Sequence, residues 1–300
     1  MSEQVGGRDS CRGARWQVHL GWCLSVGAGV AAIAGIIYAV MVVRKEATTS
    51  QGMVLPASPK AYQRLPEAIR LHRLGLDVRG DGPDVTEVYT SGSVASDEDL
   101  ACLSSWPHLR KVGLAGPGLS SAVVQNLHGL KQLTWLRLEV GLLDDKALSV
   151  LSGLTSLTSL TLGANVSDEE LQYIAALTNL RVLELYYSKV TDAGVVHLLK
   201  LKSLRKLEIP QSEITDKGIA QLVKLDNLEN LFLLGTKVTT DCLRYIPEFA
   251  KLKKLDVRDT VIRKADVEEL HRTMPKLLIF VGDSMVRGDL EGAQATVEDE

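Results

Sequence analysis

The chain has 300 residues, of which 45% are hydrophobic and 24% charged, so it is long enough for one elongated domain with appendages and too apolar for wholesale disorder. Its formal net charge of -3 gives no reason to expect nucleic acid as a partner. The cysteines form neither a CxxC metal knuckle nor a disulfide framework, since there are only four: Cys11, Cys23, Cys102 and Cys242.

A hydrophobic run occupies residues 18–43, and no charged side chain occurs from Leu20 to Val43. As a helix this stretch would be about 36 Å long, enough to cross a hydrocarbon core of roughly 30 Å. We therefore predict an N-terminal tail over residues 1–17 and a transmembrane helix over residues 18–43. A buried core helix and a cleavable signal peptide are the alternatives, but the apolar centre of a signal peptide is shorter.

Basic residues flank this run on both sides, so the positive-inside rule does not fix its orientation. We expect a single-pass signal anchor with a cytoplasmic N-terminus and the rest of the chain outside the cytoplasm. Within the run, small residues recur every four positions at Gly27, Ala31, Gly35 and Ala39. That spacing lets two helices approach closely and suggests a homodimer, although small residues are also common in membrane spans generally.

A repeat of about 24 residues organises residues 85–281. Its first position is apolar in all eight units, at Val85, Leu109, Leu133, Leu157, Leu180, Leu204, Leu228 and Leu252. Positions 4 and 6 of each unit are mostly apolar and alternate with polar neighbours, which is typical of a strand with one buried face. Positions 16, 19 and 22 are apolar at intervals of three, which suits one face of a short helix, as in Val195, Leu198 and Leu201.

A hydroxyl followed by a carboxylate precedes the expected helix in four units, at Ser96-Asp97, Ser167-Asp168, Thr191-Asp192 and Thr215-Asp216. The hydroxyl can cap the first amides of the helix, and the carboxylate can face the positive end of the helix dipole. Position 9 holds hydroxyl residues in most units, and we expect them to form a ladder along the stack: Ser93, Ser188, Ser212, Thr236 and Thr260. A row of carboxylates could alternatively bind calcium, but capping explains each one singly.

The segments LTSLTSLTLGANVSDEELQYIAAL and LRVLELYYSKVTDAGVVHLLKL resemble the leucine-rich-repeat family, in the bacterial membrane-anchored type with Ser/Thr-Asp helix starts. The resemblance implies an α/β solenoid with parallel strands on the concave side and short helices on the convex side. One such unit cannot bury its apolar face alone, whereas stacked units can. The expected flanks are a linker over residues 44–58, an N-terminal capping region over 59–84 and an acidic, disordered tail over 282–300.

The sequence shows no arrangement of catalytic residues, no metal site and no cofactor motif, so we do not expect an enzyme. The exposed strand positions are the expected working surface, because repeat solenoids bind partners in their concavity. Large or charged side chains gather there, and tyrosine, tryptophan and arginine dominate binding hot spots. The predicted partner-binding residues are Trp135, Arg137, Glu139, Glu184, Tyr186, Tyr187, Phe232 and Leu234.

Two functions fit this reading. The first is a membrane-anchored module that binds an unidentified protein or peptide on the concave repeat face. The alternative is a structural scaffold or adhesion protein that self-associates through the span and the repeats. Charge is also uneven, because acidic residues dominate from 85 to 179 and basic residues dominate from 180 to 276. Either an oppositely charged partner or the acidic tail could respond to that asymmetry, or it could reflect composition drift.

Overall fold

The computed structural model describes residues 71–72, 74–80, 84–90, 93–163 and 165–282, together with the backbone of 284–286. The described strands form one sheet in which each strand pairs with its neighbours in chain order. The strands are β1 (Asp77–Arg79), β2 (Glu87–Tyr89), β3 (Lys111–Ala115), β4 (Trp135–Glu139), β5 (Ser159–Leu162), β6 (Val182–Leu185), β7 (Lys206–Glu208), β8 (Asn230–Phe232), β9 (Lys254–Asp256), β10 (Leu278–Val281) and β11 (Ser284–Val286).

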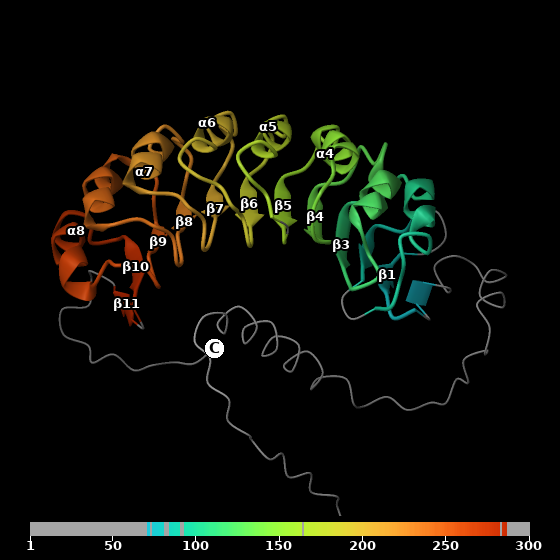
Figure 1. Cartoon of the computed structure of the whole chain (residues 1–300), viewed down its shortest axis with the longest axis horizontal. Helices are drawn as coiled ribbons and strands as arrows, with labels where there is room; N and C mark the ends of the chain where they lie inside the picture. The colour runs from blue at the N-terminus through green and yellow to red at the C-terminus, as the bar shows by residue number, and fades with distance from the viewer. Residues whose placement is uncertain are drawn as a thin grey trace, which may run out of the picture. The chain divides into compact units, whose positions relative to one another are not determined.

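Short helices connect the parallel strands and lie on the outer side of the curved repeats, whereas the strands lie on the inner side (Figure 1). Four of them are tight 3₁₀ turns: η2 (Ala101–Ser105), η3 (Ser121–Leu127), η4 (Thr240–Glu248) and η5 (Lys264–Val267). The α-helices are α4 (Asp145–Ser152), α5 (Leu171–Ile174), α6 (Val195–Leu198), α7 (Asp216–Leu222) and α8 (Glu268–Thr273). This α/β solenoid of parallel strands is the leucine-rich-repeat-like architecture that the sequence predicts.

The core is a continuous column of aliphatic side chains between the sheet and the helices. Position 4 of successive units pairs in register across the sheet, from Leu160 through Leu183, Leu207 and Leu231 to Leu255. All five side chains are fully buried. Fully burying one leucine stabilises the fold by about 1.5–3 kcal/mol, so the shared column is the main stabilising contribution. The predicted register of the eight units is therefore confirmed.

Both ends of the parallel sheet carry a strand that the sequence did not predict. At one end β1 pairs antiparallel with β2, and Leu71 and Leu76 beside it are buried. These residues lie at the first repeat, and the expected helix before Leu71 lies outside the described residues. At the other end β11 pairs antiparallel with β10. The expectation of disorder throughout residues 282–300 is therefore wrong for Ser284–Val286.

The carboxylates before the helices connect neighbouring repeats, which corrects the expectation that they act on their own helix dipole. Asp192 accepts hydrogen bonds from the backbone N and the Oγ1 of Thr215 in the next unit, at 2.9 and 2.6 Å. Asp168 does the same with Thr191, and Asp216 with Thr239. Thr215 and Thr239 in turn cap α7 and η4 by accepting from the amide two residues later, as predicted for Thr215. Thr191 accepts from the Ala193 amide in the turn before α6 and does not cap that helix.

Glycine makes room for these carboxylates. A Cβ atom on Gly218 would lie 2.5 Å from Oδ1 of Asp192, and one on Gly194 would lie 2.2 Å from Oδ1 of Asp168. Cys242 occupies the corresponding position of the following unit and is buried. Burial, with a smaller contribution from the Asp216 carboxylate, raises the pKa of the Cys242 thiol to about 12. The thiol is consequently protonated and unreactive at neutral pH.

The hydroxyls at position 9 do not form the expected ladder between repeats. Thr236 Oγ1 donates to the Leu233 carbonyl and Thr260 Oγ1 to the Val257 carbonyl, so each bond stays within one unit. The hydroxyls of Ser188 and Ser212 are buried without a hydrogen-bond partner. The threonines at this position therefore close the turn after their own strand, and none of these four hydroxyls connects two units.

Several predictions fall on residues that the structure does not describe. They are the transmembrane helix over 18–43, its Gly27, Ala31, Gly35 and Ala39 stripe, the linker over 44–58 and the end of the acidic tail. Among the described residues, no helix is both long and apolar enough to cross a membrane. Cys102 and Cys242 are buried in the first and seventh units, too far apart for a disulfide.

The inter-repeat carboxylates predict coupled effects on stability. Asp192→Ala should lower the free energy of unfolding by roughly 1–3 kcal/mol, because it leaves the Thr215 donors without their acceptor. Gly218→Ala should also destabilise the chain, although alanine normally favours a helix by about 1 kcal/mol over glycine. The cost of Gly218→Ala should shrink in the Asp192→Ala background, where the carboxylate no longer clashes. Urea unfolding followed by circular dichroism measures all three variants.

Asp145→Ala is the matched control, since Asp145 occupies the same repeat position but forms no such bond to the following unit among the described residues. It should remove only the interaction with its own helix dipole, a few tenths of a kcal/mol. Equal losses for Asp145→Ala and Asp192→Ala, or purely additive effects of Asp192→Ala and Gly218→Ala, would contradict the inter-repeat role.

Candidate binding surface

The inner face of the sheet carries most of the predicted partner-binding residues. Trp135, Arg137 and Glu139 project from β4, Glu184 lies on β6, and Phe232 lies on β8. The register places Arg137, Thr161, Glu184, Glu208 and Phe232 in one row across five neighbouring strands. At roughly 4.8 Å per strand this row is about 19 Å long.

A polar cluster occupies the middle of that row and is centred on Lys206. The Lys206 ammonium lies 2.5 Å from Oε1 of Glu184 and 2.9 Å from Oε2 of Glu208. Tyr186 donates its hydroxyl to the other oxygen of Glu208 at 3.0 Å, and Thr161 donates to Glu184 at 3.0 Å. We call Thr161, Glu184, Tyr186, Lys206 and Glu208 the central cluster.

The surroundings of the central cluster raise the pKa of two of its groups, Tyr186 and Lys206. Burial, followed by the Glu184 and Glu208 carboxylates, raises the pKa of Tyr186 well above its ordinary value, so its hydroxyl stays a donor. Burial alone would lower the pKa of Lys206, but the hydrogen bonds to both glutamates outweigh it and raise the pKa. The Lys206 ammonium also lies 5.1 Å from the centre of the Phe232 ring.

Arg137 and Glu139 adjoin this cluster and form an ion pair with each other. Glu139 leans across the next repeat, because a Cβ atom on Gly163 would lie 2.8 Å from its Cγ. Arg137 in turn acts electrostatically on the Tyr186 hydroxyl. The structure brings Arg137, Glu139, Glu184 and Tyr186 together, and most of their polar groups are already paired.

Trp135 belongs to a second group nearer the first repeat. Its ring meets the Tyr89 ring edge-on, with the ring centres 5.8 Å apart. Gly113 lies between them, and a Cβ atom there would come within 2.9 Å of Tyr89. Arg79 covers the Tyr89 ring at 5.4 Å, and Glu87 pairs with both Arg79 and Lys111. We call Arg79, Glu87, Tyr89, Lys111 and Trp135 the aromatic cluster.

Tyr187 and Leu234 lie where the chain leaves the strands. The Tyr187 side chain is 60% exposed, and its backbone has a φ of 59°, a left-handed conformation that is unfavourable for a bulky residue. The same repeat position holds Gln211, Gly235 and Asp259, all with φ between 55° and 65°. The turn geometry therefore imposes this conformation, and Tyr187 fills a position that glycine or a small polar residue would occupy at lower cost.

Sequence reasoning missed Tyr89, Thr161, Lys206 and Glu208 as site residues. Aligning position 5 across units would have placed Glu208 beside Glu184, because residues at one repeat position lie side by side in a parallel solenoid. Position 3 similarly carries Lys111, Trp135 and Lys206. A contact between residues at different repeat positions, such as that between Tyr186 and Glu208, cannot be found by aligning one position across the units.

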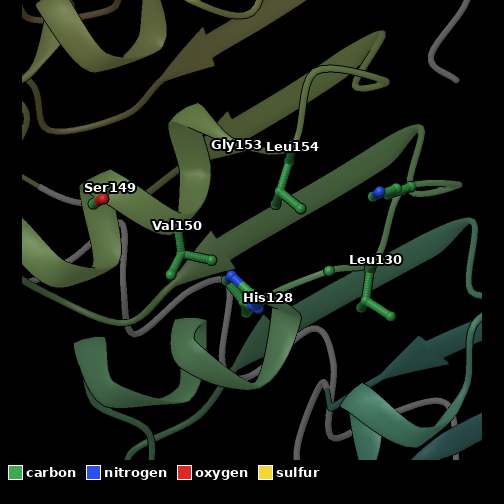
Figure 2. Close-up of a pocket in the computed structure, with 8 residues that line it drawn as sticks. His128, Leu130, Ser149, Val150, Gly153 and Leu154 are labelled. Atoms are coloured by element: carbon green, nitrogen blue, oxygen red, sulfur yellow. The ribbon is translucent and has the colours of Figure 1, made fainter.

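A pocket of about 290 Å³ lies away from the concave face, between the return turns of two neighbouring repeats (Figure 2). Its lining includes His128, Lys131, Ser149, Val150 and Leu154. Figure 2 shows the His128 ring close to the Val150 side chain. No group of three histidine, cysteine, aspartate or glutamate side chains gathers as metal ligands within the described part of the chain.

No family model matches this chain, and no curated protein matches it. Many solved structures resemble it, and three of them follow. Internalin C2 from Listeria monocytogenes has a TM-score of 0.49 and 20% identity, over 66% of this chain and 80% of that one. Internalin InlF from the same organism has a TM-score of 0.43 and 19% identity, over 61% and 64%. The mouse RP105/MD-1 complex has a TM-score of 0.44 and 16% identity, over 60% and 31%.

Such similarities carry no argument about function, because the identities do not exceed 20% and the TM-scores stay below 0.5. The assignment of the fold rests on the repeats of this chain: the in-register leucines, the parallel sheet and the helices on its outer side. The functional argument likewise rests on the concave face.

The strained turn at Tyr187 predicts a gain in stability from Tyr187→Gly. The substitution should raise the free energy of unfolding by about 1 kcal/mol, because glycine adopts the left-handed conformation without strain. Thermal unfolding of the two chains measures this difference. Gly235→Ala, at the same position two units later, should lower stability by a similar amount. A loss of stability in Tyr187→Gly would mean that the tyrosine side chain contributes packing that outweighs the strain.

Proposed function

We propose that this chain is a membrane-anchored protein-interaction module that binds a protein or peptide on its concave repeat face. The proposal depends above all on one observation: a row of three charged side chains, one hydroxyl and one aromatic ring runs across β4 to β8 on the inner face, beginning at Arg137 and ending at Phe232. A partner laid across the strands would meet both the central cluster and the exposed Tyr187 ring.

The pairing of the charged groups favours binding. Lys206, Glu184 and Glu208 hold one another in fixed positions, so a partner would not have to order these side chains on association. The carboxylate oxygens keep further acceptor capacity, and the Phe232 and Tyr187 rings supply apolar contact. A segment that offers a basic or hydrogen-bond-donating group next to an apolar side chain fits this arrangement.

The anchoring part of the proposal rests on the uncharged run over residues 18–43, which is long enough to cross a bilayer. The Ser/Thr-Asp helix starts resemble the bacterial membrane-anchored type of leucine-rich repeat. We place the N-terminus in the cytoplasm and the repeats outside it. The proposed protein is not an enzyme and needs no cofactor, since the residues of the concave face are arranged to hold one another and not to converge on a reacting atom.

The alternative function is a scaffold or adhesion protein that self-associates. It is favoured by the small-residue stripe Gly27, Ala31, Gly35 and Ala39, which could pair two spans. In that case the concave face would meet a second copy of the chain or nothing at all. The two functions therefore differ in what lies against Tyr187 and Phe232 in the cell.

Site-directed photo-crosslinking separates the two functions. A benzophenone amino acid at Tyr187 or Phe232 of the full chain should give a discrete product with a different protein when living cells are irradiated. The same amino acid at Val196, which is 54% exposed on α6, serves as the control from the outer side and should not give that product. Mass spectrometry of the product identifies the partner.

Products that contain only this chain would favour the self-associating scaffold. Equal products at Tyr187 and Val196 would contradict recognition by the concave face. Combining Trp135→Ala with Glu208→Gln should reduce the yield of a specific product about tenfold or more, because hot-spot residues of these types contribute on the order of 2 kcal/mol each.

Labelling of an introduced cysteine tests the orientation. Val94 is 77% exposed, so Val94→Cys should react with a membrane-impermeant maleimide on intact cells if the repeats lie outside the cytoplasm. The unsubstituted chain, which contains Cys11 and Cys23 as well as the buried Cys102 and Cys242, gives the background signal before and after lysis. Labelling of Val94→Cys only after the cells are lysed would place the repeats in the cytoplasm and overturn the proposed orientation.

A further inference from the structure

The excess of basic residues in the second half of the repeats is concentrated on one edge of the sheet. This edge consists of the return turns that lead into β7 to β10, residues 199–205, 223–229, 250–253 and 274–277. We call it the basic edge. Its acidic residues are Asp226 and Glu229, and its basic residues are all exposed: Lys200, Lys202, Arg205, Lys224, Lys251, Lys253 and Lys276.

The opposite edge of the same repeats is balanced in charge. The residues that follow β6 to β9 are 186–194, 209–218, 233–241 and 257–266, and their basic members are Lys189, Lys217, Lys237, Arg258, Arg263 and Lys264. The same segments carry an equal number of acidic residues: Asp192, Glu213, Asp216, Asp241, Asp259 and Asp266. A general change in composition along the chain would alter the charge of both edges. Because only one edge has an excess of basic residues, that excess is a property of the basic edge.

The basic edge neutralises only part of its own charge. Arg205 and Lys253 share the single carboxylate of Glu229, at 3.2 and 2.6 Å. Lys202 and Lys251 bond to uncharged oxygens, those of the Lys224 carbonyl and the Asn227 side chain. Within the described part of the chain, Lys200, Lys224 and Lys276 form no ion pair. An anionic occupant would therefore find several unneutralised ammonium groups in one row.

The path of the chain leads to this edge. The parallel strand β10 starts at the basic edge, with Leu278 opposite Lys254 and its amide bonded to the Lys253 carbonyl. After the turn at Gly282, β11 runs back antiparallel to β10, and Val286 pairs with Ile279. The chain thus leaves the last strand at the same edge from which β10 departs.

The segment that follows is acidic. Residues 287–300 contain one basic residue, Arg287, and the acidic residues Asp289, Glu291, Glu298, Asp299 and Glu300. Fully extended, fourteen residues reach about 46 Å, whereas three strand spacings from β10 to β7 cover roughly 14 Å. The segment is therefore long enough to follow the basic edge past all four turns.

We propose that residues 287–300 dock on the basic edge through charge pairing with the turns that lead into β7 to β10. The tether gives these carboxylates an effective concentration in the millimolar range at the edge, an advantage that no separate anionic partner has. Because the lysines are exposed, the contact depends strongly on ionic strength.

Carbodiimide cross-linking of the full chain, reconstituted in phosphatidylcholine, tests this proposal. The reagent joins a carboxylate to a lysine amine only when the two touch, and peptide mapping locates the product. At about 0.01 M salt, where the screening length is roughly 30 Å, we expect Glu291 and the acidic group 298–300 to be joined to Lys202, Lys253 or Lys276. At about 1 M salt, where it is roughly 3 Å, the yield should fall at least fivefold.

Two matched variants make the result specific. Lys200→Gln, Lys224→Gln and Lys251→Gln together remove charge from the basic edge without touching an ion pair, and should reduce cross-links to Lys202 and Lys253 at least threefold. Lys189→Gln, Lys217→Gln and Lys264→Gln remove the same charge from the opposite edge and should leave them unchanged.

Three results would overturn the proposal. Cross-links spread evenly over both edges would show that the segment has no preferred site. Cross-links that join ¹⁴N to ¹⁵N copies in a mixed sample would make a second chain the occupant. Absence of cross-links, together with basic-edge-dependent binding of the full chain to added vesicles containing phosphatidylserine, would assign the edge to an anionic membrane surface instead.

Discussion

No unit of this chain can hide its own leucines, and every other feature of the structure depends on that constraint. Leu183 and Leu207 are fully buried only because a neighbouring strand and helix lie on either side of each unit. At the two ends, where no further repeat follows, β1 and β11 pair antiparallel with the outermost parallel strands. The stacking also fixes the spacing of the inner face, since side chains at one repeat position recur at every strand.

Hydrogen bonds and ion pairs also connect neighbouring units, in addition to the shared leucine core. The Asp192 carboxylate bonds to Thr215 of the next unit, and Gly218 leaves the space that this carboxylate needs. On the inner face of the sheet, Lys206 pairs with Glu184 of the preceding repeat and with Glu208 of its own strand. The same device, a charged group held between two neighbouring repeats, thus supports the fold near the helices and prepares the concave face for contact.

Charge pairing on the concave face distinguishes it from the basic edge. Lys206 is enclosed by two carboxylates, whereas Arg205, the preceding residue, shares Glu229 with Lys253 at the rim. On the concave face the charged side chains are already paired and ordered. Binding there depends more on shape and apolar contact, because fewer side chains have to be ordered when a partner binds. A surface with excess ammonium groups favours an anionic occupant and responds to salt. The two surfaces therefore suit two different kinds of contact on one scaffold.

The repeat pattern alone determined the fold class, the strand register and the outward direction of Trp135, Arg137 and Glu184. These follow from local periodicity, because a 24-residue unit that buries positions 1, 4 and 6 can only stack. Tertiary structure decided what periodicity cannot encode: that Asp192 bonds forward to the next unit, that Tyr89 packs on Trp135, and that β11 returns the chain to the basic edge. The first two depend on which side chains of neighbouring repeats are long enough to touch, and the third depends on the direction of the chain after a turn. Neither feature recurs at regular intervals in the sequence, so the repeat pattern does not reveal it.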